Sequence, residues 1–189
     1  MTCPRHWLST RESFQVHMNI SNVKTSQLVG EFTFNHGTAK RLLDINWVDG
    51  QNITSDDGRV YILCVNGEIK KIGGSQSKGG IKSTMSFYIS ANQGRPSIRS
   101  FGIMSLIANE LNKGNKVTLH LITSPQVTAP VTGLFGVVEC KISAFKEMER
   151  QCLQGYKDHT GGYPDWNFQE SGTAWSKEIQ TQHALMLTK

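Results

Sequence analysis

The sequence predicts a small α/β (α+β) domain, in which a central antiparallel sheet is flanked by helices. Two observations support this. Residues 60–65 and 68–72 are β-prone runs joined by Asn66-Gly67, which is a strong hairpin signal. Residues 100–112 and 142–158 show helical spacing, and the alternating run 116–123 lies between them. The order β-β-α-β-α indicates a compact mixed domain.

Three zones follow along the chain. Residues 1–57 mix polar stretches with short apolar runs and end in a turn, so we expect an N-terminal β-containing arm or subdomain that contacts DNA. Residues 58–170 carry the strongest strand and helix patterns and form the expected core. Residues 171–189 are expected to be a tail with a short final helix.

The turn of the 60–72 hairpin decides which side chains share a face. A two-residue turn sets Tyr61 opposite Ile72 and directs Lys71 to the other side of the sheet. A three-residue loop, with Gly67 in the left-handed region and a bulge, sets Tyr61 directly opposite Lys71. Turn chemistry permits both registers. In the second one, a phenol and an ammonium would lie side by side.

A Gly/Ser/Lys-rich loop is expected over residues 73–80, and further polar connections precede the 100–112 helix. Such loops let backbone N–H groups approach phosphates closely. The basic residues in or near these connections are candidate phosphate contacts: Lys78, Lys82, Arg95 and Arg99. Because the glycines match neither a Walker nor a dinucleotide fingerprint, we expect no nucleotide cofactor.

Glu149 interrupts an apolar stripe on the helix expected at 142–158. Phe145, Glu149, Cys152 and Tyr156 follow the i, i+4, i+7, i+11 spacing of one helix face. A carboxylate that faces inward is costly unless it is paired or holds a metal. The alternative is a glutamate at the edge of the stripe that reaches water or pairs with a basic side chain.

Composition restricts the class of partner. The net charge of +5 and pI of about 9.1 favour a polyanion such as nucleic acid. No apolar run reaches the length of a membrane span or a signal peptide, so we expect a cytoplasmic chain without a membrane partner. The four cysteines are scattered without a C-x-x-C pair, which is typical of buried thiols and not of a zinc site.

Two motifs carry a family resemblance. Val60-Tyr61-Ile62 and, ten residues on, Lys71-Ile72-Gly73-Gly74 resemble the paired motifs of the GIY-YIG nucleases. Lys71 replaces the tyrosine that most members have, as in one restriction-endonuclease branch of that superfamily. The resemblance extends over residues 58–167 and includes the turn at 133–136, the glutamate-bearing helix and the late Trp166-Asn167.

The resemblance implies a role for each catalytic candidate. Tyr61 would accept a proton from the attacking water or lie beside it, and Lys71 would help to deprotonate Tyr61 or stabilise phosphate charge. Glu149 would be the single protein ligand of Mg²⁺, for which Mn²⁺ would substitute. Asn167 would support the metal site or contact the DNA backbone; as an alternative, it caps its loop.

One position departs from the family pattern. The family places an arginine after the second motif, where its fork holds the scissile phosphate. Lys82 has that spacing here and supplies charge without the fork. Arg95 or Arg99 would replace it by reaching back from the approach to the next helix.

The resulting expectation is a metal-dependent endonuclease acting on double-stranded DNA, namely a type II restriction enzyme that works as a homodimer, because duplex cleavage needs two cuts. Two alternatives stay open. One is a non-catalytic DNA-binding protein on the same scaffold, in which Lys82 reflects lost catalysis. The other is a structure-specific repair or mobile-element nuclease that prefers branched DNA.

Overall fold

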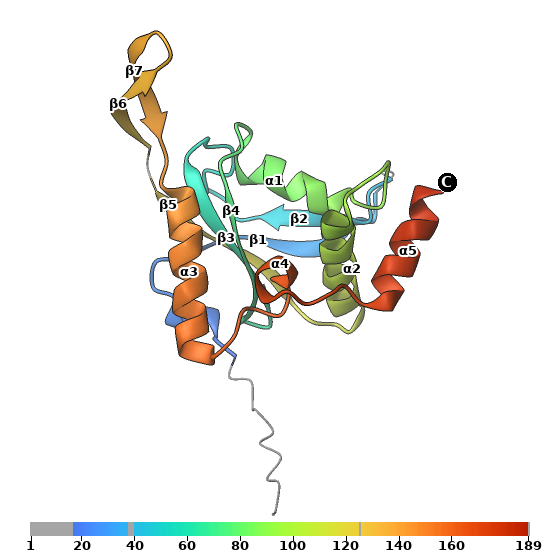
Figure 1. Cartoon of the computed structure of the whole chain (residues 1–189). Helices are drawn as coiled ribbons and strands as arrows, with labels where there is room; N and C mark the ends of the chain where they lie inside the picture. Colours follow the sequence, from blue (N-terminus) through green and yellow to red (C-terminus); the bar gives the residue numbers. More distant parts are fainter. Residues whose placement is uncertain (1–16, 38–39, 125, 189) are drawn as a thin grey trace, which may run out of the picture.

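The structure is a computed structural model that describes residues 17–37, 40–124 and 126–188. Its centre is a five-stranded, fully antiparallel sheet in the order β2-β1-β5-β3-β4 (Figure 1). The strands are β1 (Gln27–Phe34), β2 (Leu43–Trp47), β3 (Gly58–Val65), β4 (Glu68–Ser75), β5 (Val117–Ser124), β6 (Val127–Gly133) and β7 (Gly136–Ile142). The helices are η1 (Ile20–Asn22), α1 (Gly80–Ile89), α2 (Ile98–Asn112), α3 (Phe145–Thr160), α4 (Phe168–Ser171) and α5 (Lys177–Leu187).

The sheet is covered on both faces, so the molecule has three layers (Figure 1). Tyr61 and Leu63 of β3 face a large core that contains the buried side chains of α1 and α2. Val60 and Ile62 face a smaller core against α3. Because both faces are covered, every residue of β3 is buried, which explains its apolar run from Val60 to Val65. The predicted α+β class with a central antiparallel sheet is confirmed.

The β3–β4 hairpin follows neither expected register. Asn66 and Gly67 have φ of 49° and 85°, so the turn has two residues, as in the first alternative. The pairing register then shifts between Leu63 and Cys64. This shift leaves Lys70 of β4 without a cross-strand partner in β3. This β-bulge places Lys71 opposite Leu63 and sets Tyr61 opposite a glycine.

The bulge reverses the facing of Lys71. In a regular two-residue hairpin, Lys71 would lie on the side opposite to Tyr61. Here Lys71 pairs with Leu63, which lies two positions after Tyr61 on β3. Because residues two positions apart on a strand face the same side, the side chains of Tyr61 and Lys71 project toward the same face of the sheet. The phenol and the ammonium share a face, although the two residues are diagonal neighbours and not direct partners.

Two expected boundaries are wrong. Gly73, Gly74 and Ser75 do not belong to a loop, because they continue β4 and pair with β3. The helix expected from residue 142 begins at Phe145, and Ile142 instead ends β7. The reason is that residues 136–142 pair along their whole length with β6, which commits them to extended backbone.

The N-terminal zone supplies two strands of the central sheet. β1 pairs with β5 and with β2, so part of residues 1–57 extends the sheet that contains the β3–β4 hairpin. The contact of this zone with DNA stays a prediction.

The tail contains the expected final helix, α5. None of the helices within the described ranges has the length and apolar character of a transmembrane span.

β6 and β7 form a separate two-stranded hairpin that projects from the body of the molecule (Figure 1). It leaves the sheet at the end of β5 and returns to α3. The sequence predicted its turn at 133–136, but the two strands were not expected.

Candidate active site

Tyr61 lies in the core at the centre of a small polar cluster. Its side chain is buried, and its hydroxyl oxygen lies 2.8 Å from that of Tyr88, which projects from α1. Burial raises the pKa of the Tyr61 phenol well above its usual value, and the neighbouring Tyr88 raises it further. Arg99 acts in the opposite direction. Tyr61 is therefore a protonated phenol that needs a proton acceptor before it can act as a base.

Arg99 belongs to the first turn of α2, which begins after the capping residue Ser97. From there it interacts electrostatically with Tyr61, Tyr88 and Lys71. Its Nη1 donates a hydrogen bond of 2.9 Å to Oε1 of Gln169. The guanidinium and the helix N-terminus together create a positive region beside the phenols.

Lys71 is the buried cation of this cluster, with only 2% of its surface exposed. Burial lowers the pKa of its ammonium to about 8, and the positive charge of Arg99 contributes to the decrease. The carboxylates of Glu170 and Glu149 partly offset it. A lysine with this pKa changes charge close to neutral pH, so it can exchange a proton with a neighbouring phenol.

Glu149 approaches the same region from the opposite face of the sheet. It projects from α3 over Gly74, where an added Cβ would lie 2.5 Å from its Oε2. An added Cβ on Gly73 would overlap the ring of Tyr61. Because β4 is an edge strand and two consecutive residues lack side chains, the phenol and the carboxylate come together across its backbone.

Glu149 is suited to hold a hard cation. It is half-buried and lines an open pocket of about 320 Å³ together with Glu170. In the described part of the chain, no hydrogen bond or ion pair engages its carboxylate. Magnesium prefers one or two carboxylates and keeps most of its waters. An open pocket with two carboxylates fits this requirement.

Asn167 is buried completely beside β4. Its Oδ1 accepts a hydrogen bond of 2.9 Å from the backbone N–H of Ile72, and its Nδ2 donates one of 2.8 Å to the carbonyl of the same residue. Nδ2 also lies 3.2 Å from Oε2 of Glu170. These bonds fix the position of Glu170 relative to β4. A direct contact of Asn167 with metal or DNA stays a prediction.

The other basic candidates lie outside this cluster. Lys82 is exposed on α1, and Lys78 is exposed in the loop before that helix. Arg95 is exposed ahead of α2 and lines a separate surface pocket with Phe87. Of the residues considered as the phosphate clamp, only Arg99 meets Tyr61 and Lys71.

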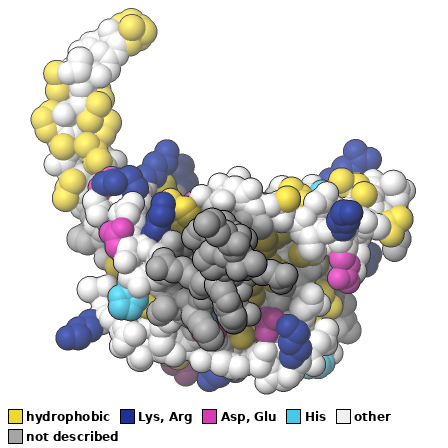
Figure 2. Space-filling model, turned by 60° about the horizontal axis from the view of Figure 1, so that its bottom comes forward, with side chains coloured by type: hydrophobic (Ala, Val, Ile, Leu, Met, Phe, Trp, Pro, Cys, Tyr) yellow, Lys and Arg dark blue, Asp and Glu magenta, His cyan; other side chains and the backbone are white. Residues whose placement is uncertain are grey.

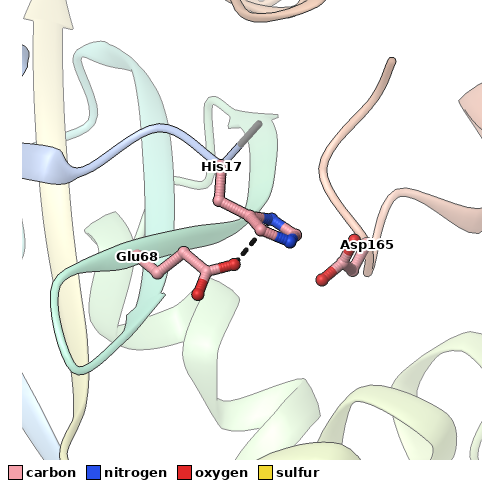
Figure 3. Close-up of side chains that lie close together, drawn as sticks. All are labelled: His17, Glu68 and Asp165. Atoms are coloured by element: carbon pink, nitrogen blue, oxygen red, sulfur yellow. Dashed lines mark ion pairs between the residues drawn. The ribbon is translucent and has the colours of Figure 1, made fainter. Parts of the chain in front are cut away.

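A second group of potential metal ligands lies at the start of β4. His17, Glu68 and Asp165 come from three distant parts of the chain and place a ligand atom each within 4.8 Å of one another (Figure 3). The Lys70 ammonium pairs with both carboxylates, at 2.8 Å from Asp165. Because this ammonium already balances the carboxylates, the group anchors residues 163–167 to β4, and a cation would have to displace Lys70.

Two members of the cluster were not identified from the sequence. Tyr88 looked like an ordinary core aromatic, and only its position on the same face of α1 as Met85 and Ile81 indicates that it points inward. Glu170 lies in a zone without clear periodicity. Its only sequence signal is its place three residues after Asn167.

The fold can be compared with known proteins. No protein-family profile matches the chain, and no curated protein sequence matches it. A structure of a bacteriophage T4 EndoII mutant aligns with 78% of this chain and 95% of its own, with a TM-score of 0.51 and 16% identity. Restriction endonuclease HPY188I in complex with product DNA aligns with 85% of this chain and 96% of its own, with a TM-score of 0.43 and 20% identity. The likeness to the T4 protein shows a shared fold.

Proposed function

We propose that this chain is a metal-dependent endonuclease of the GIY-YIG type that hydrolyses phosphodiester bonds in double-stranded DNA. The observation that carries the proposal is the meeting of Tyr61, Lys71, Arg99 and Glu149, which come from four elements, at the Gly73-Gly74 edge of β4. A base, a cation near its pKa, a guanidinium and an unpaired carboxylate are the groups that phosphodiester hydrolysis needs. The fold shared with T4 EndoII agrees with it.

Each side chain has a role in this reaction. Tyr61 takes the proton of the attacking water, after Lys71 as a neutral amine has accepted the phenol proton. The fork of Arg99 binds two oxygens of the scissile phosphate. It replaces the family arginine, whose position in the sequence is occupied here by Lys82. Glu149 would hold Mg²⁺ or Mn²⁺, which supplies charge stabilisation at the leaving oxygen when it is bound. Glu170 and Asn167 position these groups.

Further parts of the proposal concern substrate and assembly. We expect a type II restriction enzyme that cleaves a short palindromic sequence in the cytoplasm. Lys78 and Arg95 are exposed and would contact DNA phosphates outside the active site. Because the described residues form one such site, two cuts require two chains, and a two-fold dimer suits a palindromic target.

The first test is cleavage of long unmodified duplex DNA with Mg²⁺ or Mn²⁺. The wild-type protein should give discrete fragments, and Glu149→Gln and Tyr61→Phe should give none while still binding DNA. Glu147→Gln is a matched control, since Glu147 is exposed on the same helix and pairs with Arg150. It should cleave normally.

The outcomes separate the alternatives. Salt-sensitive DNA binding without cleavage in either metal would indicate a non-catalytic DNA-binding protein. Cleavage restricted to flapped or branched duplexes would indicate a structure-specific nuclease. Mixed dimers of wild-type and Glu149→Gln chains test the assembly: they should cut one strand, and normal cleavage of both strands would contradict one site per strand.

A further inference from the structure

The β6–β7 hairpin has one apolar face. Its cross-strand partners alternate between the two sides of the ribbon, so every second pair projects in the same direction. One face contains the pairs Val127–Ile142, Ala129–Cys140 and Val131–Val138. The opposite face contains Thr128–Lys141, Pro130–Glu139 and Thr132–Val137.

This apolar face is exposed over most of its length. The exposed fractions are 61% for Val127, 54% for Val138 and 41% for Ile142, and at the tip 89% for Leu134 and 98% for Phe135. Figure 2 shows hydrophobic side chains along the whole projecting arm. A two-stranded hairpin is only marginally stable in water by itself, so an extended apolar face on one indicates a partner.

The size of the surface matches a protein interface. With residue areas on the order of 150–240 Å², the exposed fractions of the face residues Val127, Val131, Val138 and Ile142 amount to roughly 330 Å². Leu134 and Phe135 at the tip add roughly 390 Å². Each partner of a standard stable complex contributes about 800 Å². The hairpin alone therefore supplies nearly the area that one half of a dimer interface requires.

The charge of the hairpin argues against DNA phosphates as the partner of this face. Residues 127–142 contain one lysine, Lys141, and one glutamate, Glu139, and the two lie on the opposite face. DNA binding needs an excess of Lys and Arg to neutralise phosphates. A surface without net charge, formed by Val, Ile, Ala and Cys, instead suits another apolar protein surface, and a second copy of this chain offers one.

We propose that the apolar face of the β6–β7 hairpin is the homodimer contact and packs against the same face of a second copy of this chain. Two such ribbons would stack about 10 Å apart, as sheets do in a sandwich, and each would bury the valines of the other. A two-fold axis between the hairpins makes the contact isologous and closed. The inference rests on the proposed homodimer and assigns its surface.

Two neighbouring valines provide a matched test. Val138 is on the apolar face and Val137 is on the opposite face, with exposed fractions of 54% and 67%. We would measure the oligomeric state of the full chain by analytical ultracentrifugation from roughly 0.1 to 100 μM, a range that covers dissociation constants of typical stable dimers. Val138→Glu should raise the dimer dissociation constant about 100-fold or more, whereas Val137→Glu should leave it near that of the wild type.

The results distinguish this inference from the proposed function. A wild-type dimer that survives Val138→Glu would overturn the hairpin contact and leave the dimeric nuclease intact. Equal loss of the dimer in both variants would also overturn it, because charge would then act through the hairpin fold. A wild type that stays monomeric throughout would overturn both the contact and the homodimer, while nuclease activity is measured separately by cleavage.

Discussion

Replacing Lys71 by Met should make the protein more stable and inactive. Lys71 is 2% exposed, and its pKa lies at about 8 against an ordinary 10.5, mainly because of burial. The difference of about 2.5, at 1.36 kcal/mol for each pKa unit, means that keeping the ammonium charged in the fold costs roughly 3 kcal/mol. Met has a similar length and no charge. At pH 7, Lys71→Met should therefore raise the free energy of unfolding by up to about 3 kcal/mol, or the Tm by roughly 6–12 °C.

Because the pKa of Lys71 is lower in the folded chain, the stability difference between the wild type and Lys71→Met depends on pH. Between pH 8 and 10.5, the unfolded chain keeps the Lys71 proton that the folded chain has released, so the wild type gains stability as pH rises. By pH 9.5, about 2 kcal/mol of the advantage of the Met variant should be gone. Urea unfolding at a series of pH values without metal or DNA measures this difference.

A control and a contrary result complete the test. Lys82→Met changes an exposed lysine, so it should alter stability by less than about 0.5 kcal/mol. Two results would contradict this: a Lys71→Met variant that is less stable than the wild type at pH 7, or a stability difference that does not depend on pH. Either would mean that the attraction of Glu149 and Glu170 for the ammonium exceeds the cost of its burial. The cost assigned to Lys71 would then be wrong.

Three further predictions concern the rate of cleavage. Gly74→Ala should lower the rate about 100-fold, because the added methyl group displaces Glu149, whereas Gly155→Ala on α3 has open space and should not; an active Gly74→Ala would contradict this position of the carboxylate. Arg99→Lys keeps the charge and loses the fork, so single-turnover cleavage should fall roughly 10- to 100-fold with DNA binding retained, and an unchanged rate would exclude bidentate binding. The wild-type rate should rise with pH through about 8 as Lys71 loses its proton, and a rate that falls there would make the ammonium the active form.

The central hairpin and the glutamate-bearing helix could be predicted from the sequence because their signals are local. Asn66-Gly67 specifies the turn, and the position of Glu149 within an apolar stripe indicates that it faces inward. The bulge at Lys70 could not be predicted from the turn residues, because the contacts of Lys70 include a distant part of the chain. Lys70 is held by Glu68 and by Asp165, which is 95 residues away.

Other parts of the structure were missed for different reasons. The strands of the β6–β7 hairpin alternate apolar and polar residues, but the helical spacing of the next segment extends back to Ile142 and obscures the second strand. Tyr88 joins the site through its contact with Tyr61 of β3, and Glu170 joins it through its bond with Asn167. No spacing in the sequence relates Tyr88 to Tyr61, 27 positions away.

The bonds of Asn167 have a consequence for the solubility of the protein. β4 is an edge strand, and an open edge offers unpaired N–H and C=O groups to any extended chain. The Asn167 amide bonds both backbone groups of Ile72 as a neighbouring peptide unit would, and the N–H of Trp166 bonds the carbonyl of Lys70 at 2.8 Å. Residues 166–167 thus make the hydrogen bonds that an additional strand would make at this edge. They block its pairing with another extended chain, which is the first step of aggregation.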